Sequence, residues 1–267
     1  MGAISNILNI LREVSLGEFY FEIALLLRQT IFLSTVLLNS EAWINLTAKN
    51  IEDLEKNDQI LMKRIFEAPV TTPIKTLYLE SGSYPLRFHI KTRRVMFLHY
   101  LLNRGSNEMI NKILWAQVKD PTKNDWYSTV KNDLIVLGLN YLDLTDIKNM
   151  KRSTFKKLAK ERCNDLVLKF LLKGNEDKSK LKNLKYYQLN IQPYLLSKTI
   201  STRQKKYLFP FRTRMIKVGY NYGRKVHCPL CKSDIGDTQE HMFNCIIMKQ
   251  VTKLAPYSAF SWILPFF

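Results

Sequence analysis

The chain has 267 residues, of which 46% are hydrophobic and 12% aromatic, with 9 glycines, 9 prolines and 4 cysteines. This composition supports one or two packed domains and excludes a disordered, collagen-like or disulfide-stapled protein. The formal net charge is +18, and residues 148–227 account for it, because they hold 22 basic residues and only 4 acidic ones. A basic excess focused in one segment favours a polyanionic partner, with nucleic acid first and an anionic membrane surface second.

The N-terminal part of the chain is predicted to form packed helices. Apolar residues at helical spacing predict a helix near residues 4–11, a nearly all-apolar helix over 18–38 and an amphipathic helix over 47–65. The all-apolar segment is interrupted by Arg28-Gln29, and a charge at mid-span disfavours a membrane helix. We therefore expect this segment to be buried in a bundle.

The middle of the chain is also predicted to be helical. Basic side chains give its first helix a basic face and make its last helix strongly basic. Residues 173–185 are expected to form an exposed charged linker, whereas the pattern over 186–217 favours no single structure. The expected helices run over 86–102, 109–118, 126–137 and 145–172, and the basic face of the first consists of Arg87, Lys91, Arg93 and Arg94.

One spacing near the C-terminus indicates a metal site. Cys228 and Cys231 are separated by two residues, His241 follows after nine more, and Cys245 after a further three. Two cysteines at this spacing can form a knuckle that directs both sulfurs at one ion, and a His and a Cys four apart share one face of a helical turn. Three thiolates and an imidazole suit Zn²⁺, and a filled four-ligand site is structural, not catalytic.

Other interpretations of these residues stay open. The four could be unrelated, with Cys228 and Cys231 as redox-active or unligated thiols. His227 could replace a ligand, although its position next to Cys228 would strain the geometry. Cys163 lies far away in the chain and is interpreted as an ordinary, half-buried thiol.

The sequence around the knuckle resembles a known family. Phe211-Arg212-Thr213-Arg214-Met215 before the first cysteine, and Asp237-Thr238-Gln239-Glu240-His241 within the motif, look like the C-terminal region of reverse transcriptases from non-LTR retrotransposons. Upstream motifs resemble the stretch that follows the palm in those proteins, so the resemblance covers roughly Gly2 to Cys245. These motifs are Leu27-Arg28-Gln29, Asn39-Ser40-Glu41-Ala42-Trp43, Leu77-Tyr78-Leu79-Glu80, Pro85-Leu86-Arg87-Phe88, Arg93-Arg94, Ala116-Gln117 and Asp125-Trp126.

The resemblance implies a mainly α fold whose parts grip the RNA template and the DNA target or primer. The expected parts are a thumb-like helical bundle over 1–90, a basic helical connector over 91–200, a zinc-knuckle module over 201–250 and an apolar tail over 251–267. The expected partners are RNA, DNA and the palm and fingers domains of a full-length reverse transcriptase, with neither a membrane nor a small-molecule substrate. Because no targeting signal is found, we expect an intracellular protein of the nucleus, the cytoplasm or both.

The carboxylates that such polymerases need are missing. The family's Tyr-Ala-Asp-Asp motif helps to hold two metal ions, and this sequence contains no Asp-Asp pair. The densest acidic cluster, Glu52-Asp53 with Glu55 and Asp58, is interpreted as the solvated face of a helix. No nuclease domain fits before Met1 or after Cys245, so we expect a fragment that begins after the palm and is not an enzyme by itself.

The basic residues of 148–217 carry the binding hypothesis. Some populate one face of a predicted helix, and others interleave with aromatic residues before the knuckle, which suits single-stranded or structured nucleic acid. The alternative is a zinc-stapled structural or protein-interaction module that does not bind nucleic acid. The predicted contacts are Lys148, Lys151, Arg152, Lys156, Lys157, Lys160, Arg203, Lys205, Lys206, Arg212, Arg214 and Lys217.

Isolated histidines and tryptophans are interpreted as structural. His89 and His99 could reach phosphates, but histidines in such a helix are more often satisfied within the fold. The tryptophans have mostly apolar neighbours and are expected to be core anchors, not base-stacking platforms. They are Trp43, Trp115, Trp126 and Trp262.

Overall fold

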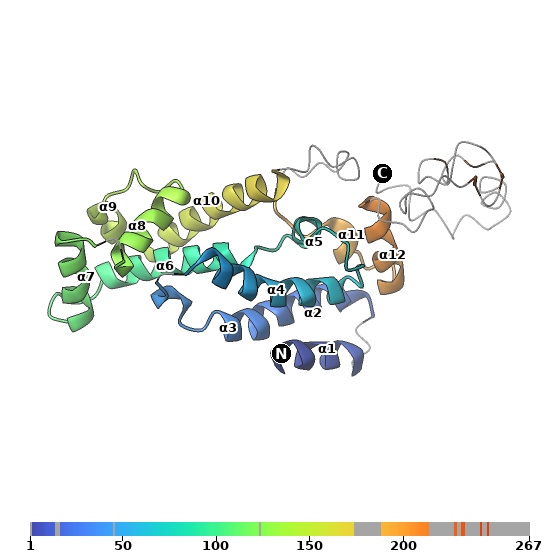
Figure 1. Ribbon diagram of the computed structural model, residues 1–267, viewed down its shortest axis with the longest axis horizontal. Helices are drawn as coiled ribbons and strands as arrows, with labels where there is room; N and C mark the ends of the chain where they lie inside the picture. The colour runs from blue at the N-terminus through green and yellow to red at the C-terminus, as the bar shows by residue number, and fades with distance from the viewer. Residues whose placement is uncertain are drawn as a thin grey trace.

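The computed structural model describes residues 2–13, 17–44, 46–122, 124–173, 188–213, 227–228, 231–232, 241 and 245. Within these residues the chain is mostly helical and has no strand, which confirms the expectation of a mainly α fold (Figure 1). The described helices form an elongated array with α7 at one end and α12 near the other. The α-helices are α1 (Gly2–Glu13), α2 (Tyr20–Leu27), α3 (Leu33–Val36), α4 (Ala48–Ile65), α5 (Ile74–Ser81), α6 (Leu86–Leu102), α7 (Met109–Lys119), α8 (Trp126–Val136), α9 (Leu144–Asn149), α10 (Arg152–Leu172), α11 (Pro193–Leu196) and α12 (Thr202–Arg212).

Helix α6 lies at the centre of the fold. It packs against α4, α8 and α10, and its apolar side chains belong to one hydrophobic core that extends from Ile4 on α1 to Phe209 on α12. The expected boundary between 1–90 and 91–200 falls inside α6, and the same core continues past residue 200. Neither position is a break in packing within the described residues. The expected tail over 251–267 lies outside them.

The apolar segment expected over 18–38 forms α2 and α3, joined by a π turn over Arg28–Phe32. The wider turn occurs where the Arg28 side chain enters the bundle to reach Asp58. By length and composition, residues 17–36 could cross a membrane, a criterion that buried core helices also meet. Phe21, Arg28 and Phe32 are buried, but only 28% of the apolar window is, so the segment buries one face and the expectation of a fully buried helix is met only in part.

Helix α5 was not predicted, and its end depends on one glycine. Gly82 has a φ of +62° and follows the last residue of α5. A Cβ at this position would lie 2.5 Å from the backbone of Asn190, so a side chain would collide with the returning chain. The close approach lets Ser81 and Ile191 form an isolated antiparallel bridge that connects the region before α11 to the bundle.

The single helix predicted over 145–172 is two helices, α9 and α10. Asp143 starts α9 by accepting a hydrogen bond from the Asp146 N–H at 2.6 Å, and the helix ends at Met150, whose backbone is extended. The Met150 carbonyl accepts a hydrogen bond from His99 Nε2 on α6 at 2.8 Å. That carbonyl is directed at α6 and accepts no helical hydrogen bond from a described residue, so α9 ends here and a new helix, α10, begins at Arg152.

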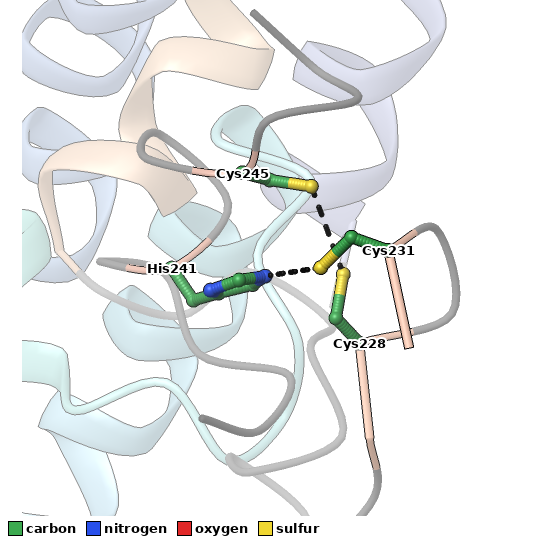
Figure 2. Close-up of side chains that lie close together, drawn as sticks. All are labelled: Cys228, Cys231, His241 and Cys245. Carbon is green, nitrogen blue, oxygen red and sulfur yellow. Dashed lines mark hydrogen bonds between the residues drawn. The ribbon is translucent and has the colours of Figure 1, made fainter. Parts of the chain in front are cut away.

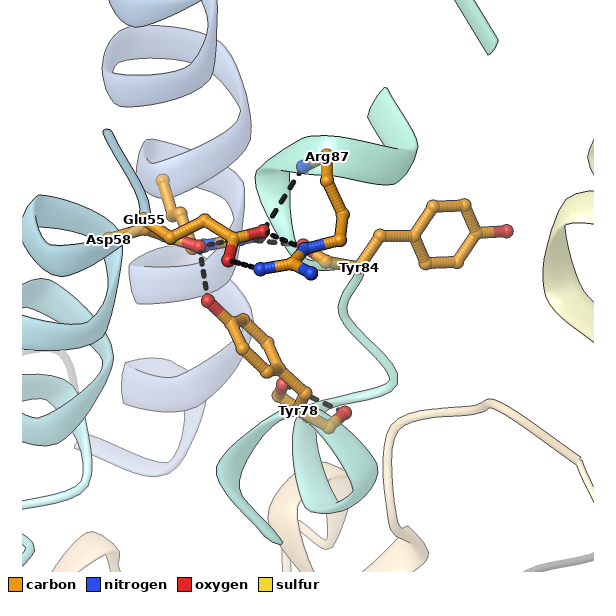
Figure 3. A network of polar contacts seen from close by, with 7 residues as sticks. Glu55, Asp58, Tyr78, Tyr84 and Arg87 are labelled. Atoms are coloured by element: carbon orange, nitrogen blue, oxygen red, sulfur yellow. Dashed lines mark hydrogen bonds and ion pairs between the residues drawn. The ribbon is translucent and has the colours of Figure 1, made fainter. Parts of the chain in front are cut away.

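The acidic cluster on α4 is only partly a solvated face, so this prediction was wrong for two of its four residues. Glu52 and Asp53 are exposed, but Asp58 and Glu55 are buried. Asp58 accepts hydrogen bonds from Arg28 Nε at 2.7 Å, Arg28 Nη2 at 2.6 Å and the Tyr78 hydroxyl at 2.8 Å. Glu55 pairs with the guanidinium and the backbone N–H of Arg87, at the start of α6. Figure 3 shows both carboxylates in this network. Burial, and then the nearby charge of Asp58, raise the pKa of Tyr78 well above its ordinary value.

The basic face predicted for α6 is directed into the protein. Lys91 and Arg94 both reach the buried carboxylate of Asp133 on α8, each at 2.7 Å. Arg93 donates to the Leu37 carbonyl at 2.7 Å. These cations are neutralised within the fold, where charges need partners because water is excluded. They are therefore engaged by groups of the fold, although the Arg93 side chain stays 40% exposed.

The two histidines of α6 are structural, as predicted. His99 is buried and its ring stacks on Phe155 with centroids 5.1 Å apart. His89 is half-buried, and its Nε2 atom is buried without a hydrogen-bond partner in the structure. Burial, followed by the charge of Arg28, lowers the pKa of His89 to about 4. The neutral imidazole is therefore the form that the fold accommodates.

The tryptophans follow the core prediction only in part. Trp43 and Trp126 are partly buried against the core, and Trp126 Nε1 donates to the Glu41 carbonyl at 2.7 Å. Trp115 on α7 is 45% exposed, which contradicts its expected role as a core anchor. The apolar residues around it in the sequence do not predict which face of α7 packs inward. Trp262 lies outside the described residues.

Candidate metal centre and basic helix face

The four predicted ligands Cys228, Cys231, His241 and Cys245 come together and could hold a metal ion. Their ligand atoms all lie within 4.8 Å of one another, with Cys228 Sγ and Cys245 Sγ 3.9 Å apart and Cys231 Sγ and His241 Nε2 3.2 Å apart (Figure 2). Zinc bonds of about 2.3 Å to sulfur and about 2.0 Å to nitrogen place two sulfurs of a tetrahedron roughly 3.8 Å apart, and a sulfur and a nitrogen roughly 3.5 Å apart. The separation between the two sulfurs is close to the first value and that between Cys231 and His241 is shorter than the second, so the cluster is compatible with one metal ion.

Burial and ligand chemistry agree with a closed site. Cys228, His241 and Cys245 are buried, and Cys231 is partly exposed. The 3.9 Å between Cys228 Sγ and Cys245 Sγ is far longer than the roughly 2.05 Å of a disulfide. Three sulfurs and one imidazole nitrogen are soft or borderline donors, and four of them fill a tetrahedron. The candidate helix caps Asp237 and Thr238 lie outside the described residues.

Six predicted nucleic-acid contacts are exposed along α9, α10 and the turn between them. Helix α10 buries Phe155, Ala159 and Cys163 against the core, which leaves its other face to solvent. On that face, cations four residues apart lie in one row, and adjacent members are separated by about 6 Å along the helix. We call this set the α9–α10 basic face; it consists of Lys148, Lys151, Arg152, Lys156, Lys157 and Lys160, all exposed.

The α9–α10 basic face is hardly neutralised within the described part of the chain. Its only ion pair there joins Lys157 to Glu161 at 4.0 Å, and both side chains are exposed, so the pair is weak. Sequence reasoning missed one exposed aromatic side chain that contacts α10: Tyr141 is 59% exposed, and the guanidinium of Arg162 lies 5.9 Å from its ring centroid. The two are some twenty residues apart in the chain, so no local sequence signal places them together.

Three other predicted contacts are engaged by groups of the bundle, one of them buried and two partly buried, and the pair made by Lys206 is at the surface. Lys205 is buried and donates to the Glu18 carbonyl at 2.5 Å, and burial lowers the pKa of its ammonium. Lys206 pairs with Glu67 at 2.6 Å. Arg212 pairs with the buried carboxylate of Glu80 at 3.3 Å. These cations attach α12 to the bundle, so we leave them out of the interface proposed below.

Of the remaining three predicted contacts, one is exposed on α12 and two lie outside the described residues. Arg203 is exposed, with its guanidinium 5.8 Å from the ring centroid of Tyr207, which is also exposed. Arg214 and Lys217 lie outside the described residues, as does most of the expected linker over 173–185.

Comparison with known proteins adds no relative. No protein-family model, no curated protein and no solved structure matches this chain. Its function is therefore inferred from the residues and their geometry.

Proposed function

We propose that this protein binds RNA or DNA through the α9–α10 basic face. The observation that carries the proposal is the contrast between two groups of cations. Those of α6 and α12 named above are paired with carboxylates and carbonyls of the fold, whereas five of the six on the α9–α10 basic face have no ion pair with a described residue. Unpaired cations in a row attract a polyanion and release its counterions on binding.

Nucleic acid is the proposed ligand because the spacing of the cations on α10 matches the spacing of phosphates along a strand. Arg152, Lys156 and Lys160 span about 12 Å of helix, over which one strand of a duplex presents three to four phosphates. Arg162, whose guanidinium lies 5.9 Å from the Tyr141 ring centroid, projects from α10 about 160° around the helix from Lys160, so this pair is not part of the row. The row itself does not distinguish RNA from DNA.

We further propose that the Cys₃His cluster holds one Zn²⁺ in a structural role. Four protein ligands leave no open position for a substrate or a water, so the ion organises the chain and does not take part in a reaction. Cys228 and Cys231 would supply the knuckle sulfurs, and His241 and Cys245 would complete the tetrahedron.

From the resemblance to non-LTR retrotransposon reverse transcriptases we propose a biological setting for this binding. In that setting the helical region would hold an RNA template or a DNA target beside the palm and fingers domains. Without an Asp-Asp pair, the chain should not extend a primer by itself. A primer-extension assay with the purified chain tests this, and nucleotide incorporation would contradict it.

The second candidate is a zinc-stapled structural or protein-interaction module. The attachment of α12 by Lys205, Lys206 and Arg212 favours it, because the segment that leads to the knuckle docks on the bundle through cations that are no longer available to phosphates. This candidate predicts a stable, zinc-loaded protein with no affinity for nucleic acid.

Charge reversal of the row on α10 separates the two candidates. In R152E/K156E/K160E, binding to a labelled RNA hairpin should fall by at least about 100-fold, because each reversal removes one phosphate contact and adds a repulsion. Fluorescence anisotropy measures the affinity, and circular dichroism checks that the variant folds.

A matched control variant has the same change in net charge, but at lysines on other helices. Lys49, Lys112 and Lys131 are exposed cations on α4, α7 and α8. The K49E/K112E/K131E variant should retain most of the affinity. Equal losses in the two variants would mean that only net charge matters, and no loss in either would refute the α9–α10 basic face as the interface.

A further inference from the structure

A groove with no assigned role lies between α1 and α4, close to α12. Its volume is about 1000 Å³, which is at the upper end for ligand sites in proteins. Leu8 and Leu11 form its wall on α1, and Ile60 lies opposite them on α4. Tyr20 and Lys206 also line it, and the ammonium of Lys206 lies 4.2 Å from the Tyr20 ring centroid.

The rim of this groove is strongly basic. One acidic residue, Glu67, lines it, and Lys206 already pairs with that carboxylate at 2.6 Å. Arg12 and Arg64 are exposed on opposite walls, and neither has an ion pair with a described residue. The cations that line the groove are Arg12, Lys56, Lys63, Arg64 and Lys206.

The floor is aliphatic and open to solvent. Ile60 is 42% exposed and Val70 is 86% exposed, although both lie among these cations. The single aromatic ring of the lining, Tyr20, is covered by Lys206. A nucleic acid would gain phosphate contacts here but would find no free ring for its bases and would lie against aliphatic side chains.

We propose that this groove binds an acidic amphipathic peptide segment of a partner protein, in helical form. Apolar side chains of the peptide would contact Leu8, Leu11 and Ile60, while its Asp and Glu side chains would pair with Arg12 and Arg64. From Lys56 to Arg64 the wall on α4 is about 12 Å long, which matches roughly two turns of a helix. This second surface is separate from the α9–α10 basic face and does not depend on nucleic-acid binding.

The test selects a helical peptide display library on the intact wild-type chain. Recovered peptides should combine Asp or Glu with Leu, Phe or Met at spacings of three and four residues. The best peptide, labelled with fluorescein, should bind R12E/R64E at least about tenfold more weakly, because two charge contacts are lost. It should also bind I60S more weakly, a variant that removes only apolar contact and keeps every charge.

The control variant K49E/K131E changes the net charge equally at exposed positions outside the groove and should bind the peptide like wild type. Recovery of peptides without this pattern, or equal binding to R12E/R64E and the wild type, would overturn the proposal. If R12E/R64E instead loses affinity for labelled poly(U) and not for the peptide, the groove is a nucleic-acid surface. Because R12E/R64E leaves the α9–α10 basic face unchanged, this result would concern the groove alone and would not count against nucleic-acid binding by that face.

Discussion

Replacing Asp58 with alanine should destabilise the fold more than any surface substitution. The carboxylate accepts two hydrogen bonds from Arg28 and one from the Tyr78 hydroxyl, all between 2.6 and 2.8 Å. Its removal leaves the guanidinium of Arg28, which is 3% exposed, buried without a countercharge. The only described acceptor that remains for that group is the Tyr84 carbonyl at 3.0 Å.

The expected loss is about 3–5 kcal/mol, which is the usual cost of removing one partner from a buried ion pair. This is a large part of the roughly 5–15 kcal/mol by which domains are normally stable. Urea unfolding followed by circular dichroism measures the loss, provided that the slope with denaturant stays constant. The control is Asp53→Ala on the same helix, where the exposed pair with Lys56 is screened by solvent and should contribute little to stability.

A double variant separates the pair from the buried volume. R28M/D58L replaces both charges with apolar groups, and it should regain most of the stability that D58A loses, because no uncompensated charge remains. A loss below about 1 kcal/mol in D58A would refute the reasoning, since it would mean that Arg28 finds water or another partner at little cost.

Three further predictions concern pH, metal and α12. The pKa of His89 is about 4 in the fold and about 6.5 when unfolded, so the unfolded chain takes up its proton first as pH falls. The free energy of unfolding should therefore drop by roughly 3 kcal/mol between pH 6.5 and 4. His89→Gln should remove this part of the pH dependence in urea titrations. Purified protein should contain one zinc per chain by mass spectrometry of the metal, Cys228→Ser should lose it, and Cys163→Ala, which alters a buried cysteine outside the cluster, should keep it. Lys205→Met should lower the unfolding free energy by about 1–3 kcal/mol, because the Glu18 carbonyl loses its donor, whereas nucleic-acid affinity of the folded protein should not change.

Helices were predicted well where the residues that determine their bounds are close together in the sequence. The helix expected over 86–102 has those bounds in the structure, because its apolar residues and the flanking Pro85 act within a few residues of one another. The helix over 47–65 is likewise found as α4 and starts with a capping box at Thr47 and Asn50. The Cys and His spacing predicted the metal cluster for the same reason, since ligand spacing is a short-range signal.

Burial of charge could not be predicted from local pattern. Asp58 and Glu55 lie on α4 in register with the apolar residues Leu54, Leu61 and Ile65, but a carboxylate is ordinarily solvated unless it has a partner. Their partners Arg28 and Arg87 are about thirty residues away in the chain, so the local pattern does not reveal them. The partner of Lys205 is even farther away in the chain, because it is the backbone carbonyl of Glu18, 187 residues earlier. Such pairs depend on how helices pack, which periodicity within one helix does not encode.

The same effect hid the basic groove. Residues 1–90 contain 8 basic and 10 acidic residues, so this segment looks neutral in the sequence. Three of those acids, Glu55, Asp58 and Glu80, are buried and neutralised by internal arginines. The groove is basic because of which side chains the fold brings to its lining, where five cations, among them Arg12 and Arg64, face one acidic residue, Glu67.

The salt dependence of RNA and DNA binding tests the central claim most directly. Anisotropy titrations of the wild-type chain with duplex DNA and with an RNA hairpin, across a salt series, give the slope of log affinity against log salt. Six phosphate contacts predict a slope of about −5 on duplex DNA, and R152E/K156E/K160E should be shallower by about 3 units, with the RNA-to-DNA ratio ranking the two partners. A folded, zinc-loaded protein that binds neither ligand at low salt, or equal slopes for the wild type and the variant, would contradict binding through the α9–α10 basic face.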